Sequence, residues 1–227
     1  MFGCKYGGGV EERMQNSYLR LEHEVAGNAL VRGLDGVVRI INAVRRVKAD
    51  ALPGSGKPWL TLIPSYPDLP MESVYTNVTR TEIPAVFARQ HGKGRVVYFP
   101  MDIDRTYWEV LSPDHAAVLR NAVDWAAPAA RAVRVKGAAV LDIACWRQKD
   151  SLSVHLVNLT NPRMMKGPIR EIYPVGPLEV TVEVPSGFVL KRVKLLTAGV
   201  EAVWRQSGSG VVVEVPRVAM HEVIVLE

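Results

Sequence analysis

The chain has 227 residues, of which 48% are hydrophobic and 22% charged. This length and composition can bury the core of one large domain or two ordinary ones, and they exclude an intrinsically disordered protein. Lysine and arginine exceed the acidic residues by 28 to 23, and the resulting charge of +5 is spread along the chain. A basic excess without a concentrated patch argues against a nucleic-acid partner.

Cysteine content and hydropathy bear on the compartment. Cys4 and Cys145 form no CxxC pair, so neither a disulfide framework nor a structural zinc site is expected. No apolar run approaches the roughly 18 residues that a membrane span needs. The first fifteen residues lack the apolar core of a secretion signal. We therefore expect a cytoplasmic protein with no membrane partner, no metal and no cofactor.

The first part of the chain mixes strands with helix. The glycine-rich residues 2–9 are typical of a helix end with no helix before it, which predicts that the chain begins inside a domain. Alternating or β-branched residues predict strands over 17–25, 37–48 and 59–63. Residues 29–36 predict a short turn of helix. The basic run Arg39, Arg45, Arg46 and Lys48 lies within 37–48 and is interpreted as a solvated strand face.

A hairpin followed by a helix is predicted after residue 83. The apolar runs 84–90 and 95–100 are joined by four residues that include two glycines, which favours a hairpin. The continuous apolar stretch within 95–100 is typical of a strand covered on both faces. Ser112 can cap the next helix, Pro113 suits its first position, and Pro128 ends it.

From about residue 130 the sequence predicts strands alone. Short alternating runs separated by turn residues, with no helical segment between them, describe an antiparallel β-sandwich. We therefore divide the chain into domains 1–129 and 130–227. The long loop 158–173 is rich in methionine and basic residues and suggests an interface. The predicted strands are 132–136, 140–146, 152–159, 178–184, 189–196, 202–206, 211–215 and 222–226.

The best candidate for a ligand or interface loop follows the strand 95–100. It contains Asp102, Asp104, Arg105, Tyr107 and Trp108. Two carboxylates two residues apart in an extended segment would point the same way, and could bind a metal or form an acid/base pair. Alternatively they cap local backbone N–H groups or pair with the arginine. No third ligand is evident, so no catalytic or metal-binding residue is assigned.

Cysteine and histidine chemistry is not expected. Cys4 invites comparison with the nucleophile elbow of amidotransferase-like domains, but no strand precedes it and no His-x-Glu follows. The histidines share no metal-ligand spacing, and His155 alternates with apolar neighbours as a strand residue does.

Aromatic residues leave two interpretations open. Flat rings can stack on sugar faces, although aromatic residues near a domain junction more often belong to a core or an interface. The aromatic set consists of Tyr107, Trp108, Trp59, Tyr66 and Tyr75.

Several motifs in order resemble the C-terminal region of large glycoside hydrolase-like proteins with a beta-galactosidase trimerisation domain. The resemblance implies a partial amidotransferase-like (flavodoxin-like) α/β domain over 1–129, without amidotransferase chemistry, followed by the β-sandwich. The motifs are ALVRGL at 29–34, LIPSYP at 62–67, GKGRVVYFP at 92–100, WRQ at 146–148 and VHLVNLT at 154–160.

The resemblance also implies what this chain does not contain. Such proteins carry an N-terminal (β/α)₈ barrel that holds both catalytic carboxylates, and a barrel alone takes about 250 residues. No residue here therefore inherits a catalytic role, and a fragment, a split gene or a misassigned start is expected. The expected partners are further copies of the chain or a separate or upstream barrel, with carbohydrate as a possible ligand.

We therefore expect a non-catalytic accessory region, for oligomerisation and packing, of a glycoside hydrolase-like protein in carbohydrate metabolism. A free-standing carbohydrate-binding module that uses Trp108 is one alternative. A small hydrolase that uses Asp102 or Asp104 is another.

Overall fold

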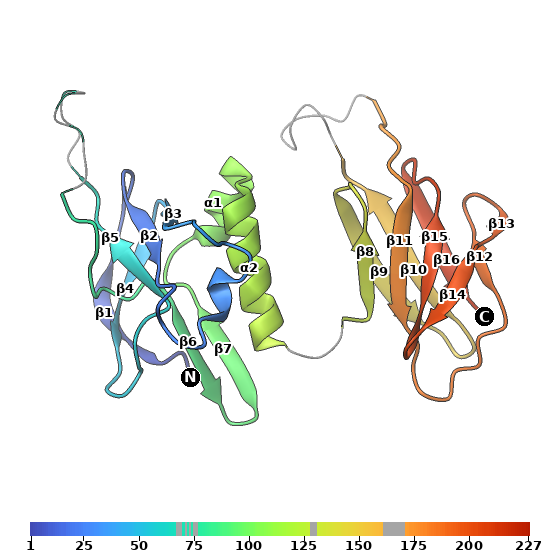
Figure 1. Ribbon diagram of the computed structural model, residues 1–227, viewed down its shortest axis with the longest axis horizontal. Helices are drawn as coiled ribbons and strands as arrows, with labels where there is room; N and C mark the ends of the chain where they lie inside the picture. The colour runs from blue at the N-terminus through green and yellow to red at the C-terminus, as the bar shows by residue number, and fades with distance from the viewer. Residues whose placement is uncertain (67–69, 71, 73, 75–76, 128–130, 161–170) are drawn as a thin grey trace. The chain divides into compact units, whose positions relative to one another are not determined.

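The structure is a computed structural model that describes the chain except residues 67–69, 71, 73, 75–76, 128–130 and 161–170. It is mostly β and divides into two compact units, Met1–Pro128 and Ala129–Glu227 (Figure 1). No helix in the described part of the chain is long and apolar enough to cross a membrane.

The first unit combines short antiparallel sheets with two helices. Its strands pair as β1 with β4, as a three-stranded sheet β3-β2-β5, and as the hairpin β6-β7. Helix α2 packs against β7 and a 3₁₀ turn at Ala29–Val31. The elements are β1 (Cys4–Glu11), β2 (Tyr18–Leu21), β3 (Arg39–Ile41), β4 (Arg46–Ala51), β5 (Leu60–Ile63), β6 (Phe87–His91), β7 (Gly94–Tyr98), α1 (Ile103–Val110) and α2 (Pro113–Ala126).

The sheet β3-β2-β5 has one apolar face and one mixed face that carries its polar side chains. Side chains alternate across a strand, so Leu19 and Leu21 of β2 point into the core and are fully buried. They pack with Ile40, Leu60 and Leu62 of the neighbouring strands, which are at most 4% exposed. The opposite face of β2 carries Tyr18 and Arg20.

The strand pairings do not show a flavodoxin-like sheet. A flavodoxin-like domain is built on a mainly parallel sheet. Every pairing between the described strands of the first unit is antiparallel. The amidotransferase-like form predicted for 1–129 is therefore not shown.

Several predictions for the first unit are wrong. Residues 2–9 do not end a helix but enter β1, whose register with β4 shifts between Tyr6 and Val10. Gly8 and Gly9 have positive φ values of 83° and 153° at this irregularity, which glycine tolerates at no steric cost. Residues 37–48 form two strands instead of one. Among the described strands, β7 pairs with β6 alone, and it is half-exposed, so it is not covered on both faces.

The hairpin and the second helix are confirmed. Strands β6 and β7 are joined by Gly92 and Lys93, and Gly92 adopts a φ of 59° in the turn. Helix α2 begins at Pro113 directly after Ser112, as predicted, although the Ser112 side chain makes no capping hydrogen bond.

The second unit contains two antiparallel sheets around one core. The sheets have the strand orders β14-β15-β11-β8 and β13-β12-β16-β10-β9. Alternate residues of β10 and β11 are buried, as expected for strands with one face on a core. The strands are β8 (Val133–Lys136), β9 (Leu141–Arg147), β10 (Leu152–Asn158), β11 (Leu178–Glu183), β12 (Val193–Leu195), β13 (Val200–Glu201), β14 (Trp204–Ser207), β15 (Gly210–Val215) and β16 (His221–Leu226).

A strand lies within or next to each predicted stretch of the second unit. The main difference is at 189–196, where only β12 is strand, and the two-residue strand β13 is an addition that the sequence did not predict. The core is aliphatic and fully buried in both sheets, for example at Val154, Val180, Val213 and Ile224.

Candidate functional site

The stretch predicted as an acidic loop forms helix α1, with Asp102 directly before its first residue. Asp102 occupies the N-cap position of α1, and its Oδ1 atom accepts hydrogen bonds from the backbone N–H groups of Val44 (3.1 Å) and Arg45 (3.0 Å). Its Oδ2 atom lies 3.9 Å from Nη1 of Arg105. Asp102 therefore fixes the start of α1 to the segment before β4. Its side chain binds backbone N–H groups of this distant segment and not the local ones that the sequence suggested, and it makes no capping hydrogen bond with α1.

The remaining candidate residues lie on α1 without converging. Asp104 is exposed in the first turn, and Arg105 pairs with Glu109 at 2.9 Å, which raises the pKa of Arg105. Trp108 is 49% exposed and Tyr107 is half-buried. A helix turns about 100° per residue, so Asp102 and Asp104 do not point the same way, contrary to the expectation for an extended segment. No three metal-ligating side chains gather anywhere in the described residues.

Substituting each of the two aspartates tests whether Asp102 has a structural role. Asp102→Ala leaves two backbone N–H groups without their acceptor, and we expect a loss of about 1–2 kcal/mol in the free energy of unfolding. Asp104→Ala serves as the matched control and is expected to change stability by less than about 0.5 kcal/mol, because this side chain is exposed. Urea unfolding measures the free energy of unfolding of each variant. A larger loss for Asp104→Ala contradicts the proposed role of Asp102 in holding α1 to the segment before β4.

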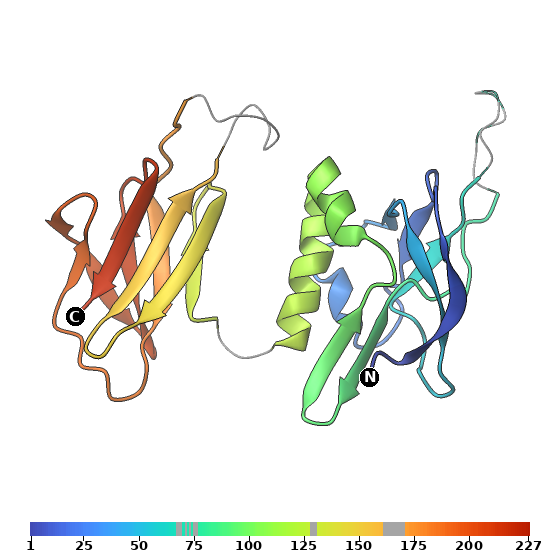
Figure 2. The same ribbon diagram turned by 180° about the vertical axis from the view of Figure 1, so that it is seen from behind.

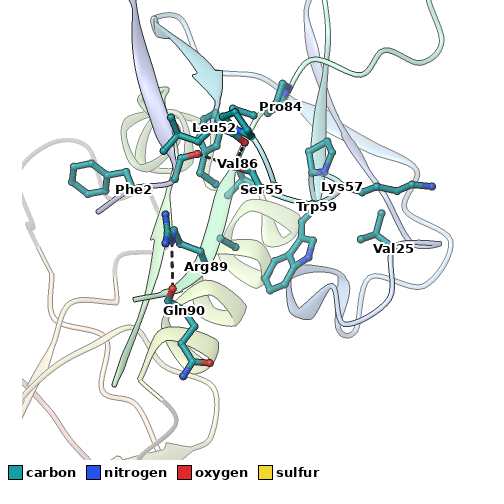
Figure 3. A pocket seen from close by; sticks show the side chains of 18 of the residues that line it. Phe2, Val25, Leu52, Ser55, Lys57, Trp59, Pro84, Val86, Arg89 and Gln90 are labelled. Carbon is teal, nitrogen blue, oxygen red and sulfur yellow. Dashed lines mark hydrogen bonds between the residues drawn. The ribbon is translucent and has the colours of Figure 1, made fainter. Parts of the chain in front are cut away.

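The first unit also contains a cavity of about 510 Å³ (Figure 3). This volume is typical of small-molecule sites. Ser55 beside it donates to the backbone oxygens of Gly3 (3.1 Å) and Leu52 (2.6 Å). Figure 3 shows that the Lys57 and Arg89 side chains lie on different sides of the cavity, so its cations do not converge on one ligand group.

The predicted aromatic platform does not form in the described residues. Of the five rings, only Trp59 lines the cavity, and it packs edge-on against Trp125 with ring centroids 5.1 Å apart. This contact joins Trp59 to the core of the unit, as the alternative interpretation holds. Tyr66 is half-buried, and Tyr75 lies outside the described residues.

The structure defines the environment of Cys4 and one contact between two histidines. Burial raises the pKa of the Cys4 thiol, which disfavours the nucleophilic thiolate. His155 and His221 form a pair on neighbouring strands, with Nδ1 of the first 3.2 Å from Nε2 of the second. The sequence did not predict this pair. Most of the predicted interface loop 158–173 lies outside the described residues.

The structure also has a hollow of about 460 Å³ beside the polar side chains of the sheet β3-β2-β5, which the sequence did not predict. Three arginines line it, namely Arg20, Arg39 and Arg80. Arg39 was interpreted as part of a solvated face, and Arg80 is distant in sequence from the other two. The alternation of polar side chains in β2 was the available signal, but it does not identify the neighbours that the fold supplies.

The fold of this chain is similar to parts of solved structures. The sequence matches no family model, and no curated protein matches it. Among solved structures, an alpha-L-fucosidase isoenzyme 2 from Paenibacillus thiaminolyticus matches the whole chain with a TM-score of 0.67 at 15% identity. A beta-galactosidase from Bacillus circulans sp. alkalophilus also matches the whole chain, with a TM-score of 0.53 at 10% identity. The chain spans only 33% and 25% of these two enzymes, respectively.

Proposed function

We propose that this chain is a non-catalytic accessory region of a glycoside hydrolase-like protein, with a role in packing and oligomerisation. The observation that carries the proposal is the extent of the structural match. Both units together, in this order, are similar to a third or less of two sugar-cleaving enzymes. In this proposal the first unit corresponds to a trimerisation domain of amidotransferase-like ancestry, and catalysis belongs to a barrel that this chain does not contain.

The edge strand β9 supports a packing role. It pairs with β10 and lies at the end of its sheet (Figure 2). Both of its faces are exposed, since Ile143 is 38% and Trp146 is 63% exposed. An edge strand with uncovered apolar side chains is an aggregation hazard unless another surface covers it. We infer that β9 is covered in the assembled protein, by a second copy of the chain or by the barrel.

The contacts of the two aspartates near α1 support a non-catalytic role for this chain. The carboxylate of Asp102 accepts hydrogen bonds from two backbone N–H groups, and Asp104 is exposed and points away from Asp102. Glycoside hydrolysis by the usual routes needs two carboxyl groups across the scissile bond. The small-hydrolase alternative therefore has no pair to use here.

The assembly of the purified chain tests this proposal. If a second copy covers β9, we expect light scattering after size exclusion to give the mass of two or more chains. Replacing Ile143 and Trp146 together with lysine should reduce the mass to that of the monomer, since like charges then meet at the interface.

A matched variant controls for added charge. Val203→Lys changes an equally exposed valine, 66% accessible, in the same unit but on no described strand. It should leave the mass unchanged. A wild-type monomer that binds neither sugar nor a barrel would refute the proposal. Hydrolysis of aryl glycosides that is lost in the Asp102→Ala and Asp104→Ala variants would favour the hydrolase instead.

A further inference from the structure

Three guanidinium groups line one hollow in the first unit. Arg20 comes from β2, Arg39 from β3, and Arg80 from the chain that leads toward β6. The side chains of Val38, Ile63 and Thr79 complete the lining. No acidic side chain is among the described residues that line it, although Glu22 and Glu24 outside the lining pair with Arg20 and Arg80.

The register of the sheet places two of these charges opposite each other. Arg20 and Arg39 are direct partners in the antiparallel pairing of β2 with β3. Like charges at directly opposed positions destabilise a sheet. An anion bound between the two guanidinium groups would remove this repulsion.

Two of the arginines, Arg20 and Arg80, form ion pairs with glutamates that do not line the hollow. Glu22 lies 2.8 Å from Nη2 of Arg80 and 3.3 Å from Nε of Arg20, and Glu24 contacts both arginines as well. Glu22 is the largest cause that raises the pKa of Arg80, with Glu24 and Glu82 adding to it. The buried Nε of Arg20 nevertheless makes no hydrogen bond. These contacts fix the guanidinium groups without supplying an anion to the hollow.

Arg39 differs from the other two arginines. Its guanidinium carbon lies 4.6 Å from the centroid of the Tyr18 ring, and it has no carboxylate partner among the described residues. Stacking on an aromatic ring orients the planar guanidinium while leaving its N–H donors free. Arg39 is therefore a preorganised donor at the hollow.

We propose that this hollow binds the carboxylate, sulfate or phosphate group of a small organic ligand. Guanidinium groups recognise planar and tetrahedral oxyanions through paired N–H donors, and such charge-assisted bonds are stronger than neutral ones. The volume of about 460 Å³ exceeds the needs of a bare ion, and Val38, which is 56% exposed, offers apolar surface to an attached carbon skeleton. The proposal is independent of the accessory role proposed above.

Calorimetric titration of the full chain tests the site. Sodium sulfate, sodium glucuronate and uncharged glucose are titrated separately at constant ionic strength. We expect both anions to bind saturably and glucose to give no saturable signal. Tighter binding of glucuronate identifies an organic anion as the ligand, whereas equal binding of both identifies the oxyanion as the whole recognition element.

Variants locate the binding. Arg39→Gln should weaken anion affinity about tenfold, the usual cost of one charge-assisted hydrogen bond. Arg39→Lys retains the charge without the forked donors and should be intermediate. Arg45→Gln removes the same charge from an exposed arginine whose ion pair is with Glu12, and should bind as the wild type does. Absence of saturable binding, or equal affinity of Arg39→Gln and wild type, overturns the proposal.

Discussion

Replacing Gly210 with alanine is expected to lower the free energy of unfolding of the second unit by about 3 kcal/mol. Gly210 begins β15 and is paired on both sides, with Glu183 of β11 and Ser207 of β14. A Cβ atom at this position would lie 2.3 Å from the backbone oxygen of Val182. Because Gly210 is paired with both neighbouring strands, its backbone cannot rotate away without breaking these pairings, so β11 and β15 would have to separate at this end.

Gly208 provides the matched control. It lies two residues earlier, in the turn between β14 and β15, with a φ of 57° and nothing within 4 Å of an added Cβ atom. Alanine there meets no neighbour and is expected to cost only about 1 kcal/mol, from the left-handed backbone conformation.

Urea unfolding followed by circular dichroism gives the two free energies. Hydrogen exchange of the β11 and β15 amides shows whether the loss is local to these strands, because opening of the pair exposes them to solvent. The close approach of the two strands is refuted if Gly210→Ala is as stable as Gly208→Ala.

The second unit was well predicted from the sequence because each strand carries its own signal. In β10 and β11 the buried residues alternate with less buried ones, and the period of two directly reports a strand with one covered face. Turn residues between the strands mark their ends. The two-residue β13 was missed because so short a strand has no period.

The first unit was predicted less well because identical residues serve different local structures. The glycines of residues 7–9 suit a helix end as well as an irregular strand, and only the pairing of β1 with β4 decides between them. Helix α1 was missed because Asp102 and Asp104 were assigned to an extended loop, although aspartate also favours the first turn of a helix. Tertiary contacts resolve both ambiguities.

Buried charges were the least predictable feature of the first unit. Arg46 was assigned to a solvated face but is 6% exposed, because it pairs with Glu11 at 2.8 Å and donates to the backbone oxygen of Pro84. Glu22 is also buried, and its partners Thr61 and Arg80 follow it by 39 and 58 residues. Alternation along one strand cannot indicate a partner at such distances in sequence.

Replacing Glu22 with glutamine is expected to lower the free energy of unfolding of the first unit by about 2–3 kcal/mol, because removing one partner of a buried ion pair leaves the other uncompensated. The Glu22 side chain is 2% exposed. It accepts a 2.5 Å hydrogen bond from Thr61 and lies against Arg20 and Arg80. The estimate lies below the full range for buried pairs because Arg80 is half-exposed and can regain water.

Glu24→Gln is the control for this prediction, because it removes the same charge next to the same arginines. Glu24 is 49% exposed, and exposed ion pairs contribute only about 0–1 kcal/mol. Urea unfolding of the two variants should therefore differ by at least about 1 kcal/mol. If Glu24→Gln loses as much stability as Glu22→Gln, burial of the Glu22 carboxylate does not hold the arginines in place. In that event the orientation of Arg20 at the hollow must come from the sheet alone.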